Sequence, residues 1–77
     1  MDRAYKSLQQ RVGTTVRQAR KQRKLSQLKL WEMSGVDFTM ISKIERGVTN
    51  PSLLTLHRLA AALELPIESF FGGTDSQ

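Results

Sequence analysis

Two short segments, each opened by a capping residue and closed by a glycine, constrain the fold of this chain more than any other feature. Ser26 is a good helix N-cap, and Gly35 can end a first helix, about Gln27–Ser34, because glycine adopts the left-handed conformation without steric cost. Asp37 is expected to cap a second helix that ends at Gly47. The pattern therefore predicts two helices joined by a tight turn, a helix-turn-helix.

Apolar residues bracket the start of each of these predicted helices. Leu25 and Leu30 occupy the two positions of a hydrophobic staple around the first cap, and Val36 and Ile41 occupy the same positions around the second. Both helices are therefore expected to enter the core in a defined direction.

The second predicted helix, residues 38–46, has two chemically different sides. At roughly 100° per residue, Ile41, Ile44 and Glu45 share one side, which is expected to pack inward. The opposite side carries the donor groups of Thr39, Ser42, Lys43 and Arg46. Such groups can donate hydrogen bonds to base-edge acceptors and to phosphates. On an arbitrary amphipathic helix, such residues would more simply be interpreted as a polar face in contact with water, but their position within a helix-turn-helix favours DNA binding.

The net charge of +5 is concentrated in the first part of the chain. Between Arg3 and Lys29 there are nine Lys or Arg residues and no acidic one, whereas one Arg and three acidic residues follow Ser52. This asymmetry indicates a polyanionic partner, with nucleic acid favoured over an anionic membrane surface. The alternative is a basic helix that only aids solubility.

The length of 77 residues predicts one small helical domain without room for an enzyme-sized cleft. The chain has no cysteine for a disulfide or a thiolate metal site, and His57 has no ligand partner at suitable spacing, so neither a metal nor a cofactor is predicted. The sequence contains no apolar run of membrane-spanning length and no catalytic constellation. We expect a cytoplasmic protein that is not an enzyme.

Further helices are predicted on both sides of the helix-turn-helix. Apolar residues at helical spacing predict a first helix from about Ser7, or from an earlier residue, to Arg23, in which Gly13 marks close packing or a bend. Ser52 is expected to cap a fourth helix, and Pro66 suits the first turn of a short fifth helix that ends at Phe71. The apolar stripe of the fourth helix consists of Leu53, Leu56, Leu59, Ala60 and Leu63.

These segments carry a specific combination of motifs: V-R-Q-A-R at 16–20, S-Q at 26–27, S-G-V at 34–36, I-S-K-I-E-R-G at 41–47 and N-P-S-L-L-T-L at 50–56. Together they resemble the Cro/repressor (XRE-type) helix-turn-helix DNA-binding domain family over roughly Leu8 to Phe71. The resemblance implies an all-α, compact, five-helix lambda-repressor-like domain at residues 7–71. Residues 1–6 would form an N-terminal extension that can fray, and residues 72–77 a disordered tail.

The resemblance also implies roles for individual residues. The recognition helix, residues 38–46, would lie in the major groove of duplex DNA. Base edges would be read by Phe38, Thr39, Ser42 and Lys43. Phosphates would be held by Gln27, Arg46, Asn50 and Arg17. Arg20 would pair with Glu45 as a structural ion pair that fixes the angle of the recognition helix, the alternative being two surface charges.

Three residues leave more than one interpretation open. Phe38 could contact a thymine methyl group or a base step, or seal the edge of the core, and Met40 could also be edge packing. Trp31 replaces the small residue, usually Ala, at which the two helices cross in the family. An indole at this position must either widen the crossing or swing aside, and we expect it to swing towards the first helix.

The sequence thus predicts a sequence-specific transcriptional regulator, a repressor or controller encoded by a bacterium or phage, that binds a palindromic operator as a homodimer. Dimer contacts are expected at Leu54, Ala61 and Phe71, unless these are ordinary exposed apolar residues. No small-molecule ligand is predicted. The main alternative is a protein-binding module of antitoxin or coactivator type that docks through Trp31, Phe38 and Met40. A third possibility is non-specific DNA or RNA binding through the basic first helix.

Overall fold

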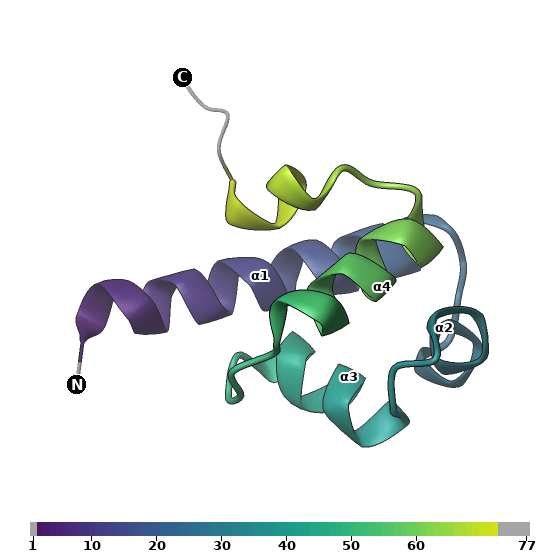
Figure 1. Ribbon diagram of the computed structural model, residues 1–77, viewed down its shortest axis with the longest axis horizontal. Coiled ribbons are helices and arrows are strands. Elements are labelled where there is room, and N and C mark those ends of the chain that lie inside the picture. The colour runs from purple at the N-terminus through teal and green to yellow at the C-terminus, as the bar shows by residue number, and fades with distance from the viewer. Residues whose placement is uncertain (1, 73–77) are drawn as a thin grey trace.

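The computed structural model describes residues 2–72, and all the secondary structure within them is helical. The elements are α1 (Arg3–Gln22), α2 (Gln27–Ser34), α3 (Phe38–Arg46), α4 (Leu53–Leu63) and the 3-10 helix η1 (Ile67–Phe71). Figure 1 shows α1 as the long helix across the middle of the molecule, with α3 on one side of it and η1 on the other. The prediction of an all-α fold is confirmed.

Residues 2–72 form four α-helices, one fewer than the five helices predicted. The last helical segment, η1, is a 3-10 helix of five residues that follows Pro66 and ends at Gly72. A segment this short cannot form a long series of α-helical hydrogen bonds, and 3-10 geometry is common in such short pieces. The fold therefore consists of four α-helices and one 3-10 turn within the described range.

The first helix begins at Arg3, which is the earlier of the two starts that the sequence allows and lies four residues before Ser7. The reason is Asp2, whose carboxylate accepts a hydrogen bond from the backbone N–H of Ala4 at 2.9 Å and so caps the helix. Residues 3–6 are therefore the first turn of α1 and not a separate extension. The expected tail at residues 73–77 lies outside the described residues.

The helix-turn-helix has the caps and bounds that the sequence predicts. Ser26 Oγ accepts a hydrogen bond from an N–H group in the first turn of α2, and Asp37 does the same for α3, both at 2.9 Å. Gly35 and Gly47 end the two helices with φ angles of 75° and 72°, in the left-handed region that favours glycine. Local chemistry alone thus sets the length of both helices.

One hydrophobic core connects the helices. Its buried residues are Val12, Val16, Leu30, Val36, Ile41, Ile44, Leu56, Leu59, Ala60, Leu63 and Phe70. Leu53, which was expected on the buried stripe of α4, is 72% exposed. It is the first residue of α4 and lies one turn before Leu56, where burial begins. One side of α3 packs on this core, and the other side lies on the surface of the domain.

Candidate nucleic-acid interface

The two sides of α3 have the environments that its sequence predicts. Ile41 and Ile44 are buried at 0% and 2% exposure. The other side consists of Thr39, Lys43 and Arg46, which are exposed, and Ser42, which is half-buried. We call these four residues the polar face of α3. Because the core fixes the opposite side, the polar face points away from the domain with its donor groups accessible.

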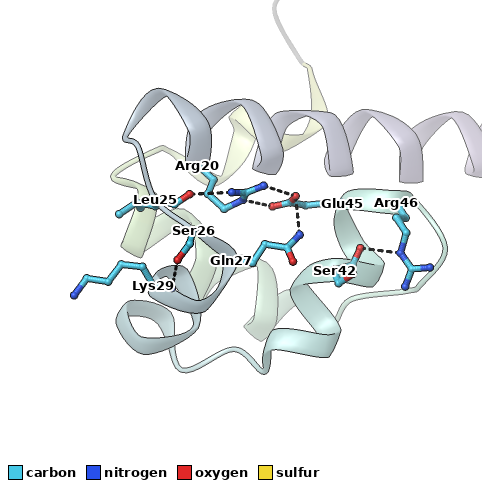
Figure 2. A network of polar contacts seen from close by, with 8 residues as sticks. All are labelled: Arg20, Leu25, Ser26, Gln27, Lys29, Ser42, Glu45 and Arg46. Carbon is cyan, nitrogen blue, oxygen red and sulfur yellow. Dashed lines mark hydrogen bonds and ion pairs between the residues drawn. The ribbon is translucent and has the colours of Figure 1, made fainter.

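A buried ion pair joins α1 to the end of α3. Arg20 Nε donates to Glu45 Oε2 at 2.7 Å, and Arg20 Nη2 donates to Glu45 Oε1 at 2.9 Å, which makes the contact bidentate. The two side chains are only 10% and 4% exposed. Figure 2 shows this pair between the two helices. Arg20 and Glu45 therefore form the predicted ion pair, and the pair is buried.

The remaining hydrogen-bonding groups of this pair are also engaged. Arg20 Nη1 donates to the backbone oxygen of Leu25 at 2.8 Å, at the entrance to α2. The hydrogen bond to the Glu45 carboxylate raises the pKa of Arg20 above its ordinary value, against the effect of burial. Arg20 thus remains charged and connects α1, α3 and the segment that leads into α2.

Gln27, a predicted phosphate ligand, is also part of this network. Its side-chain Nε2 donates to Glu45 Oε1 at 3.0 Å, as Figure 2 shows, so the amide is turned towards the ion pair. One N–H of the amide is used in this way, and the second is left for another acceptor. The sequence did not predict this contact between the start of α2 and the end of α3.

Arg17 lies at the edge of an open polar depression between α1 and α3. The depression is lined by Thr14, Arg17, Gln18, Lys21, Gln22 and Glu45. Arg17 and Lys21 are both exposed, so two cations stand on α1 beside the carboxyl end of α3. Arg17 was the predicted phosphate ligand on this helix, and Lys21 stands beside it as a second exposed cation.

Asn50 lies in the loop between α3 and α4, and its side chain is held by α1. Asn50 Oδ1 accepts hydrogen bonds from the hydroxyl of Tyr5 and from Gln9 Nε2. Arg46, at the end of α3, contacts only the backbone oxygen of Ser42 within the described range, at 3.4 Å. Neither contact was predicted. Tyr5 lies before Ser7, where the first helix was expected to begin, and Gln9 lies within the predicted helix, whose sequence does not indicate which loop will face it. The Asp2 cap was the signal that could have extended the helix.

The aromatic residues of the motif are largely outside the core. Phe38, at the start of α3, is 38% exposed, whereas Met40 is half-buried and packs against the core. Trp31 is 44% exposed, and its helix packs chiefly on α3 and α4. The indole is therefore partly covered and partly in contact with solvent, and its packing towards the first helix stays a prediction.

The candidate dimer residues are exposed on the C-terminal part of the domain. Leu54 is 54% exposed and Phe71 is 37% exposed, and Ala61 is also exposed. Leu54 and Ala61 are seven residues apart on α4 and share a face of that helix.

Residues 2–72 contain neither a group of metal-ligating side chains nor a membrane-spanning helix. No group of three or more His, Cys, Asp or Glu side chains in this range is arranged to hold a metal ion. No helix in the same range is both long enough and apolar enough to cross a membrane.

A helix-turn-helix family model, HTH_3, matches residues 16–70 of the chain. The chain is 35% identical over 65 residues to the HTH-type transcriptional regulator SutR of Escherichia coli, covering 84% of this chain and 36% of that protein. It is 38% identical over 61 residues to the immunity repressor protein of Bacillus phage phi105, covering 79% and 42%. The chain thus spans less than half the length of these two relatives.

Among solved structures, the fold is similar to that of the restriction-modification controller protein C.AhdI from Aeromonas hydrophila. The TM-score is 0.78 at 33% sequence identity, and the likeness covers 82% of this chain and 96% of that chain. The residues that the family model matches include all of α2, α3 and α4 together with the Arg20–Glu45 pair. The chain therefore belongs to the XRE-type (HTH_3) helix-turn-helix family of transcriptional regulators.

Proposed function

We propose that this chain binds duplex DNA sequence-specifically, with α3 in the major groove, and regulates transcription as a repressor or controller. The observation that carries the proposal is the polar face of α3, which the core holds outward. A major groove about 12 Å wide admits an α-helix. In it, Thr39, Ser42 and Lys43 donate to base edges, and the partly exposed ring of Phe38 contacts a thymine methyl group.

Phosphate contacts surround the polar face of α3 on three elements. Arg46 ends α3, Gln27 begins α2, Asn50 lies in the loop before α4 and Arg17 stands on α1. Arg46, Asn50 and Arg17 are exposed, and a basic domain of net charge +5 is attracted to the DNA backbone whatever its sequence. We propose that these four residues set the register of the domain on the duplex, while α3 supplies the discrimination.

The Arg20–Glu45 pair is proposed to fix the angle at which α3 enters the groove. Glu45 lies between Ile44 and Arg46 at the end of α3, so contacts that hold its carboxylate restrain the end of the helix. The bidentate contact from α1 and the amide contact from α2 hold that carboxylate from two sides. The recognition helix is then aligned before it meets DNA, which reduces the ordering cost of binding.

We propose that two copies act together on a palindromic operator. A single module of this size covers little DNA surface, whereas a symmetric pair reads two half-sites about one helical turn apart. The exposed apolar residues Leu54, Ala61 and Phe71 are the proposed dimer contacts. The site of action would be the cytoplasm of a bacterial cell, where the operator is located.

Selection from a random duplex pool tests this function directly. The chain is incubated with the pool at about 0.15 M salt, bound duplexes are amplified over several rounds, and the winner is footprinted. We expect an inverted repeat with protection on one face of the helix. Light scattering of the purified complex should give two chains per duplex. If the rounds enrich no common sequence, specific DNA binding is contradicted.

A protein-binding function is the second candidate, and one observation favours it. The helix-turn-helix exposes four large apolar side chains, Leu28, Trp31, Met33 and Phe38. Exposed apolar residues that cluster on one element often mark a protein contact. Met40, expected in this patch, packs on the core instead. Retention of DNA selection after Leu28→Lys and Trp31→Ala would separate this surface from the DNA-binding one.

A further inference from the structure

The loop that joins α3 to α4 is fastened to the first turns of α1. Lys6 Nζ donates to the backbone oxygen of Gly47 at 3.0 Å, and Gln9 Nε2 donates to the backbone oxygen of Thr49 at 2.9 Å. The side chain of Asn50 is held more closely still, because its single oxygen accepts from two donors of α1. Residues about 40 positions earlier in the chain thus determine the conformation of this loop.

The hydrogen bonds fix which way the Asn50 amide points. The backbone oxygen of Thr49 can only accept, so the atom of Gln9 that faces it must be the nitrogen Nε2. The second N–H of that nitrogen is directed at Asn50, 2.9 Å away, so the facing atom of Asn50 must be its oxygen. Asn50 Nδ2 is then the atom on the far side. It donates to no other residue between 2 and 72, and Asn50 is exposed.

We propose that Tyr5 and Gln9 are positioning residues for DNA binding, which hold the Asn50 amide so that Nδ2 donates to a backbone phosphate. The proposal rests on the proposed DNA-binding function. An unrestrained asparagine amide can turn either its nitrogen or its oxygen outward, and an outward oxygen meets a phosphate as a second acceptor. Because Tyr5 and Gln9 of α1 donate to Asn50 Oδ1, only Asn50 Nδ2 faces outward. The amide is therefore ordered before it meets the phosphate.

The decisive variants remove the two donors with little change in shape. Tyr5→Phe deletes one hydroxyl from a residue that is 36% exposed, so the fold is retained. Gln9→Met keeps the length of the side chain and deletes its amide. The matched control is Gln10→Met, because Gln10 is exposed on the same helix and its side chain makes no hydrogen bond to residues 2–72.

DNA affinity is measured by titration with a duplex carrying the selected sequence. We expect the double variant Tyr5→Phe/Gln9→Met to bind about tenfold more weakly, because the released Asn50 amide is no longer ordered and can present its oxygen to the phosphate instead of its nitrogen. The slope of log affinity against log salt should remain nearly the same, since no charge is removed. Gln10→Met should bind within about twofold of the unmodified chain.

A double-mutant cycle with Asn50→Ala separates positioning from general support of the loop. Asn50→Ala removes the proposed phosphate donor, so removal of Tyr5 and Gln9 from that background should cost less than about twofold. Ethylation of single phosphates should likewise reduce binding of the unmodified chain at one phosphate per half-site and have no effect there on the double variant. A full tenfold loss in the Asn50→Ala background would overturn the positioning role.

The state of the Asn50 amide can also be measured without DNA. Nitrogen-15 relaxation of its side-chain NH2 group should give an order parameter of about 0.8 in the unmodified chain and below about 0.6 in the double variant. If the Asn50 amide were equally mobile in the unmodified chain and the double variant, or if both bound the operator equally well, the positioning role of Tyr5 and Gln9 would be overturned. The proposed DNA-binding function would not be affected. If the unmodified chain selects no DNA sequence, the proposed function fails and this proposal fails with it.

Discussion

A side-chain carbon on Gly13 would lie 2.3 Å from the backbone oxygen of Ile44 and 2.9 Å from that of Glu45. The backbones of α1 and α3 therefore cross in direct contact at this point. The close approach explains why a glycine stands inside a 20-residue helix, where it has the lowest propensity of any residue except proline. It also means that the placement of α3 depends on the absence of one methyl group.

We predict that Gly13→Ala destabilises the domain by about 1–3 kcal/mol, the usual cost of overpacking. The atoms that the new methyl group meets belong to the backbone of α3, which cannot rotate away. This cost exceeds the gain of up to about 1 kcal/mol that alanine normally brings to a helix interior. Urea unfolding followed by circular dichroism gives the free-energy difference.

Thr14→Ala is the control for the gain in helix propensity, since Thr14 is exposed on the same helix. It should leave the free energy of unfolding unchanged or raise it by a few tenths of a kcal/mol. A Gly13→Ala variant at least as stable as the unmodified chain would show that α3 can shift without cost.

The Arg20–Glu45 pair gives a second prediction, about a buried charge left alone. Either Arg20→Met or Glu45→Met should lower the free energy of unfolding by about 3–5 kcal/mol, because the remaining charged group stays buried without a partner. The double variant should recover part of that loss, since two apolar side chains can pack together. A double variant as unstable as the sum of the singles would contradict this account.

The pH dependence of this pair follows from the raised pKa of Arg20. A group whose pKa is raised by folding contributes its full stabilisation below its unfolded-state pKa and loses it only as the pH rises through the folded-state value. For an arginine, this window lies in strong alkali. We therefore expect no loss of this contribution between about pH 7 and pH 10. Unfolding curves of the unmodified chain and the double variant should keep a constant difference across this range.

Local sequence signals were sufficient for the helix-turn-helix. Ser26 and Asp37 cap their helices through hydrogen bonds to neighbouring N–H groups, and Gly35 and Gly47 end them through their own φ angles. Each of these effects acts within one helical turn, so a linear sequence contains all the information. The same holds for the buried side of α3, which follows from helical periodicity.

Contacts between distant elements were predicted only where the family resemblance supplied them. The Arg20–Glu45 contact was expected in this way, whereas the bonds of Tyr5 and Gln9 to Asn50 were not. A polar side chain on a helix does not indicate which loop will lie beside it after folding. The partial exposure of Trp31 depends in the same way on how α2 packs on α3 and α4, which a local sequence pattern does not indicate.

Lys43→Ala should reduce sequence discrimination more than it reduces stability. Lys43 is exposed in the middle of the polar face of α3, so its removal leaves the core intact. We predict a loss of about 1–3 kcal/mol in discrimination at one base position per half-site. Competition between the selected operator and single-base variants measures this loss. An unchanged order of preference would remove Lys43 from the residues that read bases.

Arg46→Ala should weaken binding to every sequence alike, because a phosphate contact carries no base information. Arg46 is exposed at the end of α3, and the single hydrogen bond of its side chain to residues 2–72 is a long one, 3.4 Å from Nε to the backbone oxygen of Ser42, so the guanidinium is available to the DNA backbone. We predict that the slope of log affinity against log salt falls by about one unit, with the ratio of specific to non-specific affinity unchanged. Arg58→Ala is the matched control, since Arg58 is an exposed cation on α4 outside the proposed interface. If both variants changed the salt slope equally, Arg46 would act only through the net charge of the domain and not through a phosphate bound at the end of α3.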